Sequence, residues 1–320
     1  MSVRVVGEHD ARRLLPMQEC IEAMEAALAS LARDELHNPL RFVVRPPGAA
    51  TLMGLMPAYR SEPVATYSLK TVCIAPRNRE RGLDSHQGFV AVFSGETGEV
   101  LGLVNAGAIT AIRTAAVTAV ATKLLARPGS TTLGLPGAGT QGKSHLEAMR
   151  AVLPLERVRA WSRTPGSVAS LGEGVEEVAT AEEAVRGADV VVTATSAPEP
   201  IVRRNWLAEG VHVNAVGSSI PTTRELDTET MAAAALYVDR RESTVNESGD
   251  YLFAARDGAI APDHIRGEIG ELLIGAVEGR QSDSELTVFK SLGLAVEDLA
   301  AAELVLQRAE AEGAGVEVDL

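Results

Sequence analysis

Cysteine is scarce in this sequence, and its scarcity limits the kinds of protein that the chain can be. The 320 residues include two cysteines, Cys20 and Cys73, which do not form a C-x-x-C pair. Two isolated cysteines exclude a disulfide framework and a cysteine-ligated zinc site, and they are typical of the reducing cytoplasm. The six histidines also lack the spacing of metal ligands, so we expect no metal site.

Long apolar runs and an excess of positive charge are missing as well. The most apolar helix-like stretch, residues 111–126, is interrupted by Arg113 and Lys123 and is too short to cross a bilayer. Residues 1–13 carry charges where a signal peptide has an apolar segment. The net charge of −13 repels nucleic acids and acidic membrane surfaces. We therefore expect a cytoplasmic protein that binds neither nucleic acid nor membrane.

The first part of the sequence predicts a helix followed by an antiparallel sheet. Residues 17–33 place apolar side chains on one face of a helix, namely Ile21, Met24, Leu28 and Leu31. Short β-rich runs with an intervening turn follow at residues 66–74, 88–93 and 100–105. A second helix is predicted over residues 110–125, and it ends before the Arg-Pro-Gly boundary signal at 127–129.

After this boundary the pattern changes to strands that alternate with helices. Strands are predicted at residues 131–135, 158–161, 188–195 and 211–216, and helices at 141–153 and 296–312. This alternation is typical of a parallel, doubly wound sheet. The predicted fold class is therefore α/β, with a Rossmann domain and a second, α+β domain.

A glycine-rich turn lies between the first of these strands and its helix. Its three glycines form G-x-G-x-x-G, which permits a tight turn, close approach of a pyrophosphate to the backbone, and packing of helix on strand. The helix N-terminus adds free N–H groups for the phosphates. We expect a dinucleotide to contact the whole turn, Gly137, Ala138, Gly139, Thr140, Gln141 and Gly142.

The same turn also fits a different pattern. Residues 137–144 read G-x-x-x-x-G-K-S, the Walker A loop of a nucleotide triphosphatase, with Lys143 and Ser144 as phosphate and magnesium ligands. Such an enzyme also needs a strand that ends in aspartate, whereas residues 190–195 run into threonine and serine. The dinucleotide interpretation is therefore preferred, with Lys143 as a solvated helix residue.

The end of the second Rossmann strand indicates which dinucleotide binds. An NAD enzyme has a carboxylate there for the ribose 2′-hydroxyl. This chain has Ser162, Arg163 and Thr164 instead. An arginine between two hydroxyls suits a 2′-phosphate, so NADP(H) is predicted over NAD(H), which stays possible.

Several further blocks are distinctive. They are Leu-Met-Pro-Ala-Tyr at 55–59, Ser-Leu-Lys-Thr-Val at 68–72, Ser-His-Gln at 85–87, Ile-Thr-Ala-Ile-Arg-Thr-Ala-Ala at 109–116, Asn-Ala-Val-Gly-Ser at 214–218 and the segment 286–299. With these blocks in this order, the sequence resembles the ornithine cyclodeaminase/mu-crystallin family nearly end to end. The resemblance implies a homodimer with a substrate-binding and dimerisation domain (1–118 with 297–320) and a Rossmann domain (119–296).

The resemblance also implies a site, because family members act on α-amino acids or their imines with a nicotinamide cofactor. The positions that match substrate-binding residues are Arg41, Lys70, His86, Arg113 and Ser219. Further positions that match the cofactor site are Thr114, Thr195, Ser196, Val216, Gly217, Ser291 and Gly293. Lys70 and Arg113 are the predicted catalytic residues, and His86 either lines the substrate pocket or is structural.

The residues themselves support two of these roles. Lys70 interrupts an apolar strand pattern, and a lysine inside a core strand is costly unless it is used. Arg113 lies in an apolar helix, and its guanidinium can bind a carboxylate with two parallel hydrogen bonds. Beside a carboxylate and an iminium, Lys70 can donate or accept a proton.

Two departures from the cyclodeaminase pattern favour a reductase. Where cyclodeaminases have an aspartate base this chain has Ser219, and where they have a glutamate before Leu-Met-Pro it has Gly54. We therefore predict an NAD(P)H-dependent reductase of a cyclic 2-imino acid, such as pyrroline-2-carboxylate or piperideine-2-carboxylate. The alternatives are an ornithine cyclodeaminase, an amino-acid dehydrogenase, and a binding protein without turnover.

Overall fold

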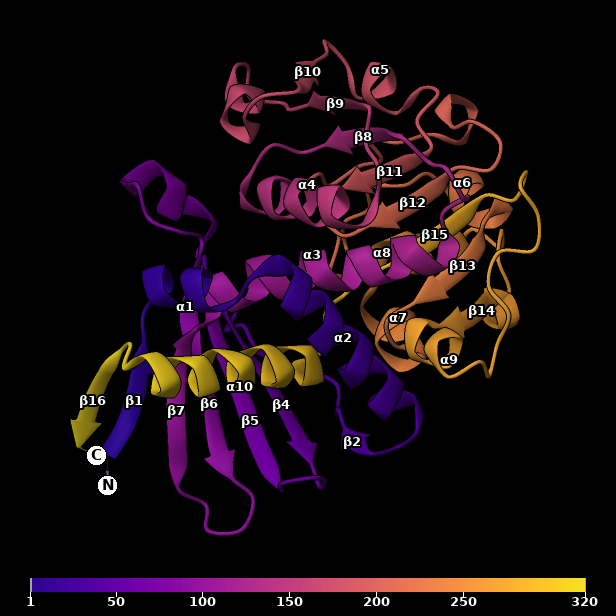
Figure 1. The fold of residues 1–320 in the computed structure, drawn as a ribbon. Helices are drawn as coiled ribbons and strands as arrows, with labels where there is room; N and C mark the ends of the chain where they lie inside the picture. The colour runs from indigo at the N-terminus through magenta and orange to yellow at the C-terminus, as the bar shows by residue number, and fades with distance from the viewer. Residues whose placement is uncertain (1, 320) are drawn as a thin grey trace. The chain divides into compact units, whose positions relative to one another are not determined.

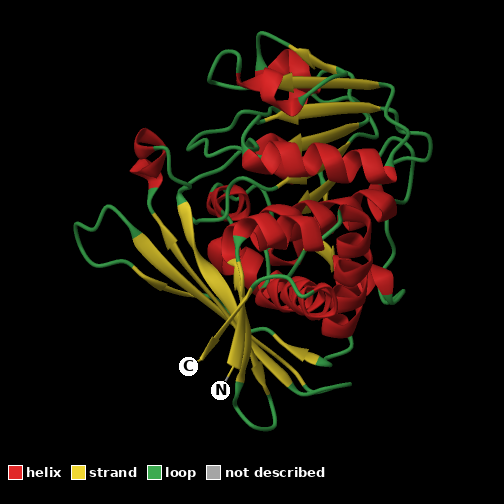
Figure 2. Ribbon diagram, turned by 60° about the vertical axis from the view of Figure 1, so that its left-hand side comes forward, coloured by secondary structure: helices red, strands yellow, loops and turns green. Residues whose placement is uncertain are grey.

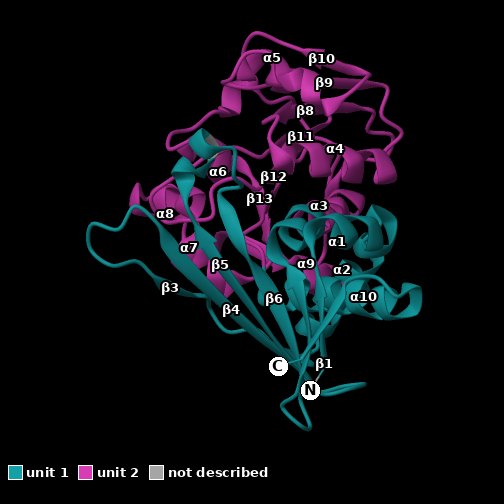
Figure 3. Ribbon diagram, turned by 90° about the vertical axis from the view of Figure 1, so that its left-hand side faces the viewer, with its two compact units in different colours: residues 1–113, 294–320 teal, residues 114–293 magenta. Residues whose placement is uncertain are grey.

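The chain divides into two compact units in the computed structural model, which describes residues 2–319 (Figure 3). Unit 1 consists of Met1–Arg113 and Leu294–Leu320, and unit 2 consists of Thr114–Gly293. Unit 1 therefore combines two distant segments of the sequence, while unit 2 is one continuous segment.

Unit 1 contains a mixed sheet with the strand order β16-β1-β7-β6-β5-β4-β2, and β3 pairs with β4. The strands are β1 (Ser2–Val6), β2 (Leu36–His37), β3 (Phe42–Val44), β4 (Leu52–Arg60), β5 (Thr66–Ile74), β6 (His86–Ser94), β7 (Val100–Asn105) and β16 (Val316–Asp319). The pairs from β4 to β7 are antiparallel, as predicted, whereas β1 pairs with β7 in parallel.

Three helices of unit 1 accompany this sheet: α1 (Glu8–Leu14), α2 (Met17–Ala32) and α10 (Ala295–Glu312). Helix α10 lies across β4, β5, β6 and β7 and packs on α2 (Figure 1). The predicted apolar face of α2 is buried. Every second side chain of β5 faces α10 and is buried, namely Thr66, Ser68 and Lys70. Tyr67, on the other face of the strand, is exposed.

Unit 2 is a doubly wound α/β domain, so the predicted fold class is confirmed. The strands of its sheet lie in the order β10-β9-β8-β11-β12-β15-β13-β14. Each neighbouring pair of strands is parallel. The strands are β8 (Thr132–Pro136), β9 (Arg157–Trp161), β10 (Val175–Glu177), β11 (Val190–Thr193), β12 (His212–Ala215), β13 (Ala235–Val238), β14 (Ile265–Glu268) and β15 (Thr287–Lys290). Their order from β10 to β12 follows the Rossmann order 3-2-1-4-5, in which strand order reverses between β8 and β11. The sixth place is taken by β15, the last strand of the unit in sequence.

The helices of unit 2 are α4 (Thr140–Val152), α5 (Ala181–Val185), α6 (Thr228–Ala233), α7 (Arg241–Glu247), α8 (Gly249–Arg256) and α9 (Ile269–Leu273). Short 3-10 helices η2 (Ser167–Leu171), η3 (Arg204–Trp206) and η4 (Pro262–His264) lie between them, and η1 (Pro76–Arg81) belongs to unit 1. The four strands predicted for this region are present as β8, β9, β11 and β12. Strands β10 and β13 to β15 were not predicted.

Helix α3 (Ala106–Leu125) begins in unit 1 and ends in unit 2. It begins earlier than the predicted residue 110 because Asn105 caps it, accepting the Ala108 N–H at 2.9 Å. With this first turn the helix is long and apolar enough to cross a membrane, which corrects the sequence-based expectation. Most of its side chains are buried, as in the core helix of a globular protein.

Candidate functional site

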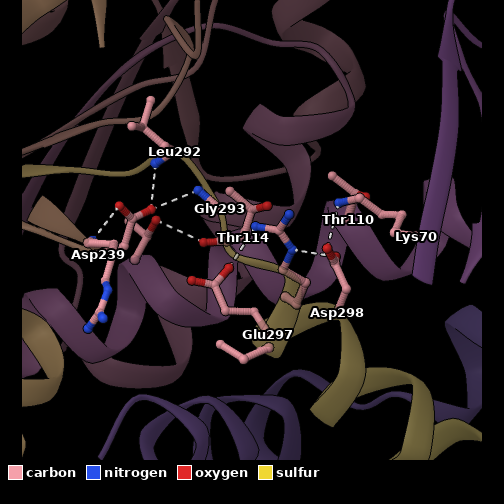
Figure 4. A network of polar contacts seen from close by, with 12 residues as sticks. Lys70, Thr110, Thr114, Asp239, Leu292, Gly293, Glu297 and Asp298 are labelled. Atoms are coloured by element: carbon pink, nitrogen blue, oxygen red, sulfur yellow. Dashed lines mark hydrogen bonds and ion pairs between the residues drawn. The ribbon is translucent and has the colours of Figure 1, made fainter. Parts of the chain in front are cut away.

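Four buried charged side chains from three elements of unit 1 form one ionic cluster (Figure 4). Lys70 on β5 places Nζ 2.8 Å from Oδ2 of Asp298. Arg113 on α3 donates from Nε to Oδ1 of Asp298 at 2.9 Å and from Nη1 to Oε2 of Glu297 at 2.8 Å. Both carboxylates lie in the first turn of α10. The side chains are at most 4% exposed, so each charge is balanced by its neighbours and not by water.

Burial and neighbouring charges change the acidity of this cluster. Burial lowers the pKa of Lys70 to about 8; Asp298 opposes the shift, and Arg113 and Arg41 add to it. Burial by itself would raise the pKa of Asp298, but Arg113 and Lys70 lower it below its ordinary value. The cluster therefore holds a fixed carboxylate beside an ammonium group that can exchange its proton near neutral pH.

The predicted substrate residues do not all meet in this cluster. Arg41 is half-buried and close enough to lower the Lys70 pKa, so it belongs with Lys70 and Arg113. His86 is exposed at the start of β6, where Nδ1 lies 3.0 Å from Oγ of Ser85. Ser219 is a half-buried residue of unit 2, in the segment that follows β12.

Sequence reasoning missed Glu297 and Asp298. Both carboxylates are fully buried and provide the partners of Lys70 and Arg113. The available signal was a pair of acidic residues in the first turn of a helix otherwise rich in alanine and leucine. Acidic residues at that place are common because they favour the helix dipole, so the signal did not separate a buried pair from a solvated one.

The glycine turn of unit 2 has the backbone that a pyrophosphate requires. Gly137 has φ 128°, and a Cβ there would lie 2.7 Å from the Ala194 carbonyl oxygen. A Cβ on Gly142 would lie 2.2 Å from the Gly137 carbonyl oxygen. At Gly139 a Cβ would meet nothing within 4 Å, and α4 begins at the next residue. The backbone of the turn is thus closely packed at Gly137 and Gly142 and has open space at Gly139. This space fits a phosphate at the helix N-terminus.

The other predicted cofactor residues lie at the carboxyl ends of the parallel strands of unit 2, where nucleotides bind in such sheets. Ser162, Arg163 and Thr164 follow β9, and the side chains of Arg163 and Thr164 are exposed. The residues that follow the next strands are Thr195 and Ser196 after β11, Val216 and Gly217 after β12, and Ser291 and Gly293 after β15. Thr114 is the exception, since it is a buried residue of α3.

A buried carboxylate fixes the segment after β15. Asp239 accepts hydrogen bonds from the backbone N–H groups of Leu292 at 2.6 Å and Gly293 at 2.7 Å (Figure 4). Gly293 has φ 78°, a conformation that favours glycine. The shape of this segment is therefore held by the Asp239 side chain and by the left-handed backbone at Gly293.

The Walker A interpretation finds no support in unit 2. Lys143 is exposed on the first turn of α4, and β11 ends at Thr193, without an aspartate for magnesium. Among the described residues, no group of three or more His, Cys, Asp and Glu side chains is arranged to hold a metal ion. The turn therefore suits the pyrophosphate of a dinucleotide better than a magnesium triphosphate.

Comparison with known proteins identifies relatives along the whole chain. The model of the ornithine cyclodeaminase/mu-crystallin family matches residues 3–313. The ketimine reductase mu-crystallin of Mus musculus is 42% identical over 292 residues, which cover 89% of this chain and 90% of the mouse protein.

Two solved structures share the complete fold. The Δ1-pyrroline-2-carboxylate reductase of Thermococcus litoralis, in complex with NADH and L-proline, has a TM-score of 0.94 and 33% identity, over 99% of this chain and 100% of that one. A dimer of an archaeal alanine dehydrogenase with bound NAD also has a TM-score of 0.94, with 30% identity over 100% of both chains.

Proposed function

Because the chain belongs to the ornithine cyclodeaminase/mu-crystallin family, we propose that it is an NAD(P)H-dependent reductase of 2-imino acids. The observation that carries the proposal is the buried cluster of Lys70, Arg113 and Asp298. It combines a guanidinium for a substrate carboxylate with an ammonium group whose pKa is lowered to about 8. A mouse relative is a ketimine reductase, and a relative from Thermococcus litoralis reduces a cyclic imino acid.

The proposed reaction assigns three tasks to the charged residues. Arg113 and Arg41 bind the substrate carboxylate and thereby fix the α-carbon. Lys70 donates a proton to the imine nitrogen, which makes the C=N carbon electrophilic. Asp298 contacts both Lys70 and Arg113 and holds them in place. The proton on nitrogen and the hydride on carbon together convert C=N to CH–NH.

The nicotinamide cofactor would be held by unit 2 through its glycine turn and strand ends. When bound, the cofactor supplies the hydride for the imine carbon. Gly137, Gly139 and Gly142 accommodate the pyrophosphate, and the residues after β9 contact the adenosine ribose. The segments after β11, β12 and β15 remain for the nicotinamide half.

The substrates that fit these tasks are cyclic 2-imino acids, which carry a carboxylate on the carbon of the C=N bond. The carboxylate of such a molecule can bind Arg113 while its imine nitrogen faces Lys70, because both cations contact the same carboxylate, Asp298. Pyrroline-2-carboxylate and piperideine-2-carboxylate have this structure.

The test of the proposal is oxidation of NADPH and of NADH in the presence of these two imines. We expect turnover with at least one of them, and formation of the cyclic amino acid as product. Ornithine and lysine are assayed in parallel for ammonia release, which would indicate cyclodeamination. Absence of turnover with both imines, in a protein that binds the cofactor, would contradict a reductase.

We further propose that NADP(H) is preferred, because Arg163 lies between two hydroxyl residues where an NAD enzyme has a carboxylate. Arg163→Ala is expected to lower kcat/KM for NADPH by about tenfold to a hundredfold, the value of a charged hydrogen bond, and to leave NADH nearly unchanged. The control is Arg157→Ala, because Arg157 is an exposed arginine at the opposite end of β9. This substitution should leave kcat/KM nearly unchanged for both cofactors. An equal loss with both cofactors would contradict recognition of the 2′-phosphate.

The proposed proton donor predicts a pH dependence. Lys70, with a pKa of about 8, is protonated below that pH and loses its proton above it. The kcat/KM for imine reduction is therefore expected to be level below about pH 8 and to fall above it. Asp298 raises the Lys70 pKa, so Asp298→Asn should move this fall to lower pH. A fall at the same pH in both proteins would assign it to the substrate and not to Lys70.

We also propose that two subunits pair through the sheet of unit 1. The face of this sheet opposite α10 carries Met53, Tyr67, Phe89 and Leu101, which are 41–50% exposed. Figure 2 shows this face without a covering helix. An apolar surface of this kind is typical of a protein interface. Light scattering should give twice the 33.6 kDa of one chain, and a monomer would contradict the pairing.

A further inference from the structure

Unit 2 contains a buried carboxylate, Glu225, that has no part in the proposed chemistry. Its Oε1 accepts hydrogen bonds from the Thr195 backbone N–H at 2.7 Å and the Thr195 hydroxyl at 2.6 Å. Its Oε2 accepts from the Thr193 hydroxyl at 2.7 Å and the Gly217 backbone N–H at 2.7 Å. Each oxygen thus receives one backbone N–H and one hydroxyl, and the residue is fully buried.

These four hydrogen bonds join the ends of two neighbouring parallel strands. Thr193 is the last residue of β11, and it pairs in register with Ala215, the last residue of β12. Beyond that row the segments that follow β11 and β12 are in direct backbone contact. A Cβ on Gly217 would lie only 2.1 Å from the Thr195 carbonyl oxygen. Glu225 therefore fixes the two segments that leave β11 and β12 relative to each other.

A second buried carboxylate holds Glu225 in place. Oδ1 of Asp250 accepts the backbone N–H groups of Glu225 at 2.8 Å and Leu226 at 2.9 Å. Oδ2 of Asp250 lies 3.0 Å from Nζ of Lys290, the last residue of β15, and both side chains are 0% exposed. Lys290 is in the same register row, opposite Ala215. The network thus connects the ends of β11, β12 and β15.

The position of this network in the sheet points to its use. Burying charges is costly, and apolar side chains could join the same elements at less expense. In the strand order of unit 2, β8, β9 and β10 form one mononucleotide half, and β11, β12 and β15 form the other. The glycine turn and Arg163 belong to the first half, which takes the adenosine. The three strands joined by the network form the half that remains for the nicotinamide.

We propose that Glu225 is a positioning residue for the nicotinamide half of the cofactor site. It presents the backbone of Thr195 and Gly217 in one fixed arrangement before the cofactor binds, so that binding does not have to order these segments. The proposal rests on the proposed nicotinamide cofactor, and it concerns binding, which is measured without turnover.

Glu225→Gln tests this role with almost no change of shape. All four partners of Glu225 donate, but a glutamine offers one oxygen and one NH2 group. The two hydroxyls can reverse their roles, whereas the backbone N–H groups cannot. Whichever way the amide turns, the N–H of Thr195 or of Gly217 faces an NH2 group, and one strand end is released.

The measurement compares two ligands at equilibrium: NADPH, and the fragment 2′-phospho-ADP-ribose, which lacks nicotinamide. Titration calorimetry of Glu225→Gln is expected to show affinity for NADPH weaker by about tenfold to a hundredfold, the effect of one unsatisfied buried donor. Affinity for the fragment should stay within about threefold of wild type. Glu268→Gln is the matched control, because Glu268 is also buried and accepts a backbone N–H, from Arg241 at 2.8 Å, but outside this network.

Equal loss of both ligands in Glu225→Gln would overturn the proposal, since a general structural role predicts that result, and so would unchanged affinity for NADPH. If Glu225→Gln does not fold, Thr193→Val takes its place, because valine fits a buried strand position and removes one of the four donors. That variant should show a smaller loss, again for NADPH alone. If the wild-type protein binds neither ligand, NADH and ADP-ribose take their places in the same comparison, and failure to bind these as well would instead refute the nicotinamide cofactor itself.

Discussion

Lys70→Ala should lower kcat/KM for imine reduction by about a thousandfold, the usual size of a general acid's contribution. The reason is the place of its ammonium group: fully buried, 2.8 Å from Asp298 and near Arg113, where solvent cannot replace it as proton donor. Affinity for NADPH should change little, because Lys70 belongs to unit 1 and the predicted cofactor residues, all beyond Arg113, belong to unit 2. Steady-state kinetics and calorimetry on the same preparation separate the two effects.

Lys143→Ala is the control for this variant. Lys143 is exposed on α4 beside the glycine turn, and its removal is expected to change kcat/KM by less than about threefold. A large effect at Lys143 would revive the phosphate-binding role of a Walker A lysine. An unchanged rate in Lys70→Ala would refute the proposed proton donor.

Arg113→Ala should remove substrate binding and also destabilise the protein. Without the guanidinium, Glu297 loses the partner at 2.8 Å and Asp298 one of its two cations. Breaking a buried ion pair from one side typically costs about 3 to 5 kcal/mol of folding free energy. Denaturant unfolding of the variant should therefore show a large loss of stability, and imine turnover should fall below detection.

Two variants separate stability from substrate binding. Arg113→Lys keeps the positive charge but loses the two-pronged geometry, so it should retain much of the stability while KM for the imine rises about tenfold to a hundredfold. Arg60 pairs with Glu303 on the same helix α10 but is partly solvated, and Arg60→Ala should cost about 1 kcal/mol or less. If Arg113→Ala were as stable as Arg60→Ala, the buried ion pairs of Arg113 would not contribute the expected folding free energy.

Local patterns in the sequence were sufficient for many elements. The run at 66–74 coincides with β5 and that at 100–105 with β7, because period-two alternation reports directly on a sheet with one covered face. The glycine turn was found because each of its glycines has a local steric reason. At Gly137 and Gly142 a Cβ would lie less than 3 Å from a backbone carbonyl oxygen, so only glycine fits. Lys70 stood out because a charge within an apolar strand is costly.

The rest depends on contacts that a local pattern does not contain. Asp298 lies 185 residues after Arg113, and nothing near either residue identifies the other. Glu225 is similar, since it follows a loop, and its burial results from the packing of β11, β12 and α8. The early start of α3 depended on one cap, Asn105, which precedes a helix that is apolar on all sides and so shows no amphipathic onset.

The same separation in sequence affects how the protein is made. During synthesis Lys70 and Arg113 leave the ribosome long before the carboxylates of α10, which follow after all of unit 2. Until then the two cations cannot be buried at low cost, because their counter-charges do not yet exist. Unit 2 is continuous and needs no later segment for its own sheet. We therefore expect the nascent chain to fold unit 2 first and to form the buried ionic cluster of Lys70, Arg113, Glu297 and Asp298 last.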